Sequence, residues 1–149
     1  MMTTDEEHVE QMKKLQADQR NRRLDSKRLD RGLVLVHTGN GKGKSSSAFG
    51  VIARALGWGH DVGLVQYIKG TWKTGERNFF KQFEPALRWH TMGEGFTWDT
   101  QDRQRDIAAA KAALQVSADM LSSGDFDLIV LDEINIVLRY DYLTVDELL

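Results

Sequence analysis

From residue 32 onward, apolar segments alternate with segments of helical periodicity. The continuous apolar runs 33–36 and 128–131 are typical of strands that are buried on both faces of a sheet. Residues 62–68 and 87–90 predict two further strands. Because helical segments separate the strands, the pattern predicts an α/β fold with a mostly parallel sheet flanked by helices.

Three of the segments between these strands have helical signals. The stretch after residue 45 has apolar residues at helical spacing and ends at Gly57 and Gly59. Residues 76–83 predict a short helix, and residues 101–122 predict a long one that ends at Gly124. The expected apolar faces are Phe49, Ile52, Ala53 and Leu56 in the first helix and Ile107, Ala110, Leu114, Ala118 and Leu121 in the long one.

Residues 1–31 differ from the rest of the chain because few of them are apolar. The spacing of Val9, Met12 and Leu15 predicts a helical arm with an apolar stripe too thin to bury much surface by itself. Residues 20–31 carry six basic and two acidic side chains. Two interpretations stay open: a solvated helix face, or an arm that closes over an anionic ligand in this subunit or in a partner subunit.

The last residues contain a helix start. Thr144 and Glu147 fit the two ends of a capping box, yet only five residues follow Thr144. A helix of that length is not stable alone. We therefore expect two parts, an N-terminal helical arm over residues 1–31 and a domain over residues 32–149 from which C-terminal units are missing.

Composition narrows the class of protein. The 149 residues have a formal net charge of −2, so no bulk charge excess attracts the chain to nucleic acid or to an anionic membrane. The absence of cysteine excludes disulfides, thiol catalysis and cysteine-ligated metal sites. No apolar run approaches the roughly 20 residues of a membrane-spanning helix. These features predict a soluble cytoplasmic protein that binds neither membrane nor nucleic acid.

The turn between the first predicted strand and the first predicted helix has the features of a phosphate-binding loop. Strand, glycine-rich turn, Gly-Lys-Ser and helix follow one another in the Walker A order. The glycines let backbone N–H groups point at phosphate oxygens, and the helix N-terminus adds partial positive charge. Lys44 adds a point charge, and the Ser45 hydroxyl can ligate magnesium. Thr38 stands where the usual pattern has its first glycine.

An acidic pair can supply the second half of this site. Asp132 and Glu133 directly follow the apolar run 128–131. The carboxyl ends of parallel strands lie at one edge of a sheet, so these side chains can meet the phosphate loop there. A carboxylate near Ser45 would bind Mg²⁺ directly or through water. The sequence therefore predicts a nucleotide and Mg²⁺ site that includes Ser45, Asp132 and Glu133.

Further motifs follow the loop TGNGKGKSS in a distinctive order. They are VQYIKGTW at 65–72, GERN at 75–78, GEGFTWDT at 93–100, LDEIN at 131–135 and YDYL at 140–143. Together they closely resemble the P-loop family of ATP:corrinoid adenosyltransferases, also called cob(I)alamin or cob(I)yrinic acid a,c-diamide adenosyltransferases. The resemblance extends from about residue 32 to the last residue, and it implies a RecA-like P-loop nucleotide-binding fold for residues 32–149.

The resemblance implies a reaction and its participants. The chain would transfer the 5′-deoxyadenosyl group of ATP to the cobalt(I) of a reduced corrinoid and release triphosphate, making adenosylcobalamin or its precursor. It would use Mg²⁺, form a homodimer and receive electrons from a reductase or flavoprotein. Lys44 would clamp the phosphate charge, while Phe96 and Trp98 would face the lower axial side of cobalt. The residues implied to hold the triphosphate are Gly39, Asn40, Gly41, Lys42, Gly43, Lys44 and Ser45.

Two alternative functions stay open at this point. A generic P-loop kinase or ATPase would release diphosphate or monophosphate or would phosphorylate an acceptor. A non-enzymatic nucleotide- or nucleic-acid-binding module would use the basic segment 20–31 and would bind nucleic acid with a steep salt dependence. For Phe96 and Trp98, the alternative to corrinoid contact is packing of a glycine-flanked loop.

Overall fold

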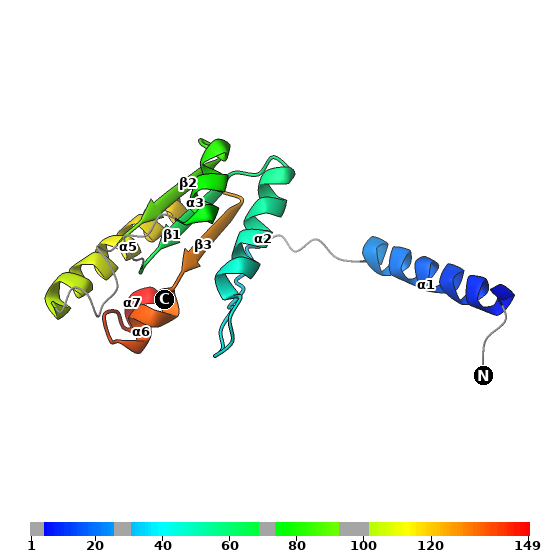
Figure 1. Cartoon of the computed structure of the whole chain (residues 1–149), viewed down its shortest axis with the longest axis horizontal. Helices are drawn as coiled ribbons and strands as arrows, with labels where there is room; N and C mark the ends of the chain where they lie inside the picture. Colours follow the sequence, from blue (N-terminus) through cyan, green and yellow to red (C-terminus); the bar gives the residue numbers. More distant parts are fainter. Residues whose placement is uncertain (1–4, 26–30, 69–73, 93–101) are drawn as a thin grey trace. The chain divides into compact units, whose positions relative to one another are not determined.

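The computed structural model describes residues 5–25, 31–68, 74–92 and 102–149 (Figure 1). The chain divides into two compact units, Met1–Val36 and His37–Leu149. Among the described residues, no helix combines the length and the apolar character needed to cross a membrane. The boundary expected between residues 31 and 32 stays a prediction.

The first unit contains one long helix, α1, over Asp5–Asp25. Its first turn is acidic, which complements the positive end of the helix dipole. The three apolar side chains Val9, Met12 and Leu15 are 51%, 39% and 47% exposed. The expected helix with its thin apolar stripe is therefore present, and the stripe is largely unburied.

The prediction of a strand over residues 33–36 is wrong. The structure assigns no strand to these residues, and the side chains of Leu33, Val34, Leu35 and Val36 are 67–86% exposed. A strand requires hydrogen bonds to a neighbouring strand. The sheet among the described residues consists of three other segments, so the apolar run alone does not produce a strand here.

The second unit is built on a parallel three-stranded sheet, as predicted. The central strand is β1 (Val62–Gln66), and its neighbours are β2 (Leu87–Thr91) and β3 (Leu128–Asp132). Every residue of β1 is buried, whereas every residue of β3 is half-buried. The expected packing of β3 on both faces is present, with Ile129 and Leu131 against one core and Leu128 and Val130 against the other, but the expected full burial is wrong. Among the described residues β3 has a neighbouring strand on one side, which leaves its side chains partly accessible.

One face of the sheet packs on α2 and α3. Helix α2 spans Lys44–Gly57, α3 spans Gly75–Phe80, and a 3₁₀ turn, η1, follows at Lys81–Phe83. These elements confirm the first two predicted helices, although Ala53, expected on the apolar face of the first one, is exposed. Their apolar side chains join those of the strands in one core of buried residues, made of Ile52, Val62, Leu64, Phe80, Leu87 and Trp89.

The opposite face packs on α5, which spans Arg103–Ser123 and ends at Gly124 as predicted (Figure 1). The apolar face expected for this helix is wrong in part, because Ala118 is exposed and Leu121 is 65% exposed. Ser117 lies in the core instead: its hydroxyl donates to the Ala113 carbonyl at 2.8 Å and pairs with the Tyr67 hydroxyl at 2.8 Å. A polar residue whose hydrogen bonds are satisfied can occupy a core position, and a hydrophobic pattern does not reveal it. The buried positions of α5 are Ala110, Ala113, Ser117 and Met120.

Two short helices, α6 (Ile134–Arg139) and α7 (Val145–Leu148), complete the described chain. The capping box predicted at the start of the last helix is confirmed, with Thr144 and Glu147 bonded reciprocally. Lys111 on α5 lies 3.3 Å from the Glu147 carboxylate. This ion pair and the cap hold the four-residue helix α7, which is too short to be stable alone.

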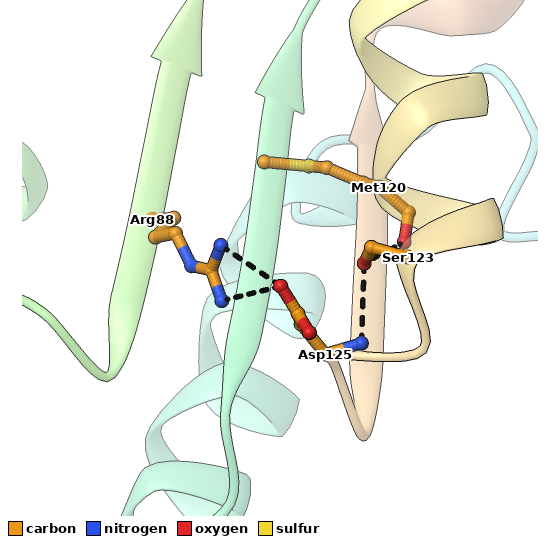
Figure 2. Close-up of polar contacts among 4 residues, drawn as sticks. All are labelled: Arg88, Met120, Ser123 and Asp125. Atoms are coloured by element: carbon orange, nitrogen blue, oxygen red, sulfur yellow. Dashed lines mark hydrogen bonds and ion pairs between the residues drawn. The ribbon is translucent and has the colours of Figure 1, made fainter.

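The amino ends of the strands are held by close packing and by exposed ionic contacts (Figure 2). Arg88 on β2 donates to the Asp125 carboxylate at 3.3 and 3.4 Å, and its guanidinium lies 4.2 Å from the centre of the Phe126 ring. A Cβ atom at Gly63 on β1 would lie 3.0 Å from the Met120 sulfur. A side chain at position 63 would therefore require the Met120 or Phe126 side chain to shift.

Candidate functional site

The glycine-rich turn before α2 has the backbone conformation of an anion-binding loop. Gly39 has φ 137° and Gly43, the N-cap of α2, has φ 102°. Both angles favour glycine, and a Cβ at either position would meet no atom of the described residues within 4 Å. Among the residues that the structure describes, no side chain caps α2, and the first turn of this helix has no acidic residue. Its N–H groups are therefore suited to bind an anion. Thr38 is not among the residues with positive φ, so this position does not need the usual glycine.

Lys44, the first residue of α2, lies across this loop. Its ammonium group donates to the Gly39 carbonyl oxygen at 2.8 Å and to the Gly41 carbonyl oxygen at 2.5 Å. The positive charge is therefore held beside the loop backbone, where phosphate oxygens would approach.

The carboxyl end of β3 meets the start of α2, as the topology predicts. The Ser45 hydroxyl donates to Asp132 Oδ1 at 2.9 Å, across 87 positions of sequence. Helix α2 packs on β3 and β1, and this packing brings the two groups together. A serine hydroxyl beside the phosphate loop and an acidic strand end thus lie within hydrogen-bond distance.

A row of polar side chains continues from Asp132 across the sheet. Gln66, at the end of β1, pairs in register with Asp132 on β3 and with Thr91 on β2. Gln66 Nε2 donates to Asp132 Oδ2 at 3.0 Å, and Gln66 Oε1 accepts from Trp89 Nε1 at 2.9 Å. The site therefore extends from the phosphate loop to β2.

Glu133 follows Asp132 in an unusual conformation. Its φ of 63° and ψ of 17° lie in the left-handed region, where a residue other than glycine is strained. Partial desolvation raises the pKa of the Glu133 carboxyl and the Asp132 carboxylate raises it further, while Lys44 and Lys42 lower it. The two acids and the two lysines thus act on one another electrostatically, although Asp132 rather than Glu133 accepts from Ser45.

Comparison with known proteins decides the family. A family model described as ATP:corrinoid adenosyltransferase BtuR/CobO/CobP matches residues 30–149. The chain belongs to the ATP:corrinoid adenosyltransferase family. A corrinoid adenosyltransferase of Pseudomonas aeruginosa is 54% identical over 145 residues, which are 97% of this chain and 71% of the relative. The corrinoid adenosyltransferase CobA of Salmonella typhimurium is 42% identical over 98% of this chain and 73% of the relative, and that of Escherichia coli is 46% identical over 79% and 59%.

Membership of the adenosyltransferase family confirms the resemblance inferred from the motifs, and the parallel sheet flanked by helices agrees with the fold it implies. The matches do not favour a generic kinase or ATPase. Phe96 and Trp98 lie outside the described residues, so their contact with a corrinoid stays a prediction. The individual roles given to residues 39–45, Asp132 and Glu133 also stay predictions, although the structure brings Ser45 and Asp132 together.

The donor set of the site fits a magnesium ion. Ser45, Asp132 and Glu133 offer a hydroxyl and carboxylates, and such oxygen ligands suit Mg²⁺. In the part of the chain that the structure describes, no group of three or more acidic, histidine or cysteine residues could hold a metal ion. Magnesium bound here would therefore take most of its ligands from phosphates and water, which is its usual behaviour in nucleotide sites.

Gln66 and Trp89 are members of the site to which the sequence analysis gave no role, although Gln66 lies within the motif VQYIKGTW. The available signal was positional: Gln66 ends the apolar run of β1 at the register position where Asp132 ends β3. A buried polar residue at the carboxyl end of a central parallel strand lies where such sheets bind ligands. Trp89, in contrast, has the sequence pattern of an ordinary core aromatic residue. Its ring packs in the core, and its ring nitrogen donates a hydrogen bond to Gln66.

Proposed function

We propose that this chain transfers the 5′-deoxyadenosyl group of ATP to the cobalt(I) of a reduced corrinoid and releases triphosphate. The observation that carries the proposal is a phosphate loop whose Ser45 hydroxyl bonds Asp132 at the carboxyl end of β3, in a chain that belongs to the ATP:corrinoid adenosyltransferase family. In this reaction the electron pair of cobalt(I) forms the new bond to C5′. The C5′–oxygen bond breaks, and its electron pair leaves on the triphosphate.

This chemistry makes particular demands on the protein. Cobalt(I) supplies its own electron pair, so no side chain has to remove a proton. The protein must position C5′ toward cobalt and stabilise the charge that grows on the leaving triphosphate. Lys44 and the N–H groups at the start of α2 are suited to that second task, because both present positive charge beside the glycine loop.

The metal part of the proposal concerns Ser45, Asp132 and Glu133. A bound magnesium ion would neutralise part of the negative charge on the phosphates. Asp132 accepts from the Ser45 hydroxyl hydrogen, which leaves the lone pairs of that oxygen free to face a cation. Glu133 adds a second carboxylate next along the chain.

The remaining parts of the proposal rest on the family resemblance. Phe96 and Trp98 would cover the lower axial side of cobalt and displace its ligand, which makes cobalt(II) easier to reduce. A homodimer, a reductase or flavoprotein as electron donor and a cytoplasmic location complete the proposal. Adenosylcobalamin or its precursor would be the product.

Product analysis tests the reaction. The full chain is incubated with ATP, Mg²⁺ and a chemically reduced corrinoid, and nucleotide-derived phosphates are separated by anion exchange while the corrinoid is followed by its absorption. We expect triphosphate and an adenosylated corrinoid in equal amounts, and neither when corrinoid is left out. Diphosphate or monophosphate as the product, with an unaltered corrinoid, would contradict the proposal.

A double variant, Phe96→Ala with Trp98→Ala, tests the corrinoid side separately. ATP affinity should stay unchanged, since neither residue belongs to the phosphate loop. Turnover with a weak protein reductant should collapse, whereas turnover with pre-reduced cobalt(I) should fall much less. Large aromatics can exclude an axial ligand and water together, and alanine would readmit both. Parent-like turnover with the weak reductant would show that this loop does not assist reduction.

A further inference from the structure

The row of polar side chains at the carboxyl end of the sheet is a continuous chain of hydrogen bonds. It runs from Ser45 on α2 to Asp132 on β3, to Gln66 on β1 and to Trp89 on β2, through hydrogen bonds of 2.9, 3.0 and 2.9 Å. Thr91 adds a longer contact of 3.5 Å to the same Gln66 oxygen. Gln66 is 7% exposed and Trp89 is 9% exposed, so little water competes for the two central bonds.

The chemistry of these groups fixes which way the Gln66 amide points. An indole ring nitrogen is a donor only, so the Gln66 oxygen must face Trp89. The Gln66 NH₂ group is then directed at Asp132 Oδ2, which accepts the hydrogen bond. The other oxygen, Oδ1, accepts from Ser45. Both oxygens of Asp132 are thus occupied, and the carboxylate plane is fixed.

We propose that Gln66 is a positioning residue for the nucleotide and magnesium site: held by Trp89, it fixes the Asp132 carboxylate and through it the Ser45 hydroxyl. This inference rests on the proposed function, since it assigns a role toward metal-bound ATP. It adds a residue of the central strand, outside the loop and the acidic pair. Removing the Gln66 amide would free Asp132 to rotate, and the Ser45 oxygen would lose its fixed orientation.

The test uses Gln66→Met, which keeps the side-chain length and removes both polar groups. ATP binding to the full chain is measured by titration calorimetry, once with excess Mg²⁺ and once with EDTA. We expect binding of ATP with Mg²⁺ to weaken about 10- to 100-fold, the usual cost of removing a group that orients a metal ligand. Binding in EDTA should not change, because Lys44 and the loop are intact. Equal losses in both conditions would overturn the inference, as they would indicate a general distortion.

A matched control lies at the next position of the same strand. Tyr67 is 2% exposed and its hydroxyl bonds Ser117 on the α5 face, away from the row. Tyr67→Phe removes one buried hydrogen bond from β1, and both ATP titrations should match those of the parent. A loss of magnesium-dependent binding in Tyr67→Phe like that in Gln66→Met would overturn the inference, because any disturbance of β1 would then suffice.

A double-mutant cycle tests whether Gln66 acts through Asp132. We expect Asp132→Ala alone to weaken binding of ATP with Mg²⁺ at least as much as Gln66→Met does. Adding Gln66→Met to Asp132→Ala should then have little further effect, since coupled residues are not additive. Additive losses would overturn the inference. If Gln66→Met fails to fold, Gln66→Glu replaces it, because it keeps the acceptor for Trp89 and loses the donor to Asp132.

Failure of this inference can be distinguished from failure of the proposed function. A parent chain that binds ATP with Mg²⁺ but forms no adenosylated corrinoid contradicts the proposed function and leaves the role of Gln66 in binding measurable. A parent that is fully active, together with a Gln66→Met variant whose binding of ATP with Mg²⁺ is unchanged, contradicts the inference alone.

Discussion

The two ends of the parallel sheet use polar residues in different ways. At the amino end, the Arg88–Asp125 ion pair is exposed, with side chains 46% and 55% accessible (Figure 2). Gly63, at the same end of the sheet, lies close to the Met120 side chain. At the carboxyl end, the bond between Gln66 and Trp89 is buried, and the row of polar contacts leads to the open glycine loop.

This difference indicates that residues at the amino end of the sheet stabilise the fold, whereas residues at the carboxyl end position groups for ligand binding. An exposed ion pair contributes little to the free energy of unfolding, so the amino end of the sheet is stabilised mainly by packing. A buried polar row must have every member satisfied, and it fixes the orientation of each member. Substitutions at the amino end should therefore change stability and leave ATP binding intact, while those at the carboxyl end should weaken ATP binding.

The largest expected effect is at the phosphate loop. Lys44→Ala should reduce turnover by about 100-fold or more, because it removes the charge that stabilises the leaving triphosphate. The free energy of unfolding should change by less than about 0.5 kcal/mol, since the Lys44 side chain is exposed. A turnover assay and urea unfolding measure these two quantities, and titration calorimetry measures the ATP affinity, with the exposed Lys81→Ala as control. Unchanged ATP affinity in Lys44→Ala would contradict the assignment of the loop.

The next effect is on stability at the amino end. Gly63→Val should lower the free energy of unfolding by about 1–3 kcal/mol, because the added atoms overlap Met120 and Phe126. ATP affinity of the folded protein should stay at the parent value. The control is Gly50→Val on α2, where a Cβ meets nothing within 4 Å and no loss is expected. Weakened ATP binding in Gly63→Val would contradict the separation of the two ends.

Arg88→Ala should cause a smaller decrease in the free energy of unfolding. The exposed ion pair and the contact with the Phe126 ring together predict a loss of about 1 kcal/mol. Asp125→Asn removes the ion pair and keeps the ring contact, so its loss should be smaller. Urea unfolding of both variants checks the order. A larger loss in Asp125→Asn would show that the ring contact contributes nothing.

The smallest effect concerns pH and the last helix. Bonds to Thr144 and Lys111 lower the pKa of the Glu147 carboxyl from its ordinary 4.5. A carboxyl with a lowered folded-state pKa stabilises the fold above its unfolded pKa, and this contribution is lost as pH falls through the folded value. Thermal unfolding from pH 7 downward should therefore show a slightly weaker acid dependence in Glu147→Gln than in the parent. The same acid dependence in both proteins would contradict this role.

Much of the fold could be predicted from the sequence, and the exceptions have physical causes. The strands 62–66, 87–91 and 128–132 and the helices between them follow from apolar runs and glycine stops. The run 33–36 did not form a strand, because strand formation depends on a neighbour that local sequence does not encode. The face of α5 was misassigned because Ser117 is a core residue whose hydroxyl is satisfied by Tyr67 and Ala113.

The candidate site was predictable where a motif carries its own chemistry. The glycine loop, Lys44 and the approach of Asp132 to Ser45 follow from the Walker A order and from parallel topology. The motif VQYIKGTW contains Gln66, but its role could not be predicted, because that role depends on the strand register that pairs Gln66 with Asp132. The left-handed conformation of Glu133 could not be predicted either, because a glutamate in the sequence does not indicate a positive φ.

The contact of Lys44 with its own loop has a consequence for how the protein meets ATP. The ammonium group is held by two backbone carbonyls before any ligand arrives, so its side chain has already given up much of its rotational freedom. Ordering a lysine side chain costs up to about 2 kcal/mol of conformational entropy. The free protein carries that cost, and ATP binding becomes an exchange of neutral carbonyl partners for phosphate oxygens at an ammonium group that is already in place.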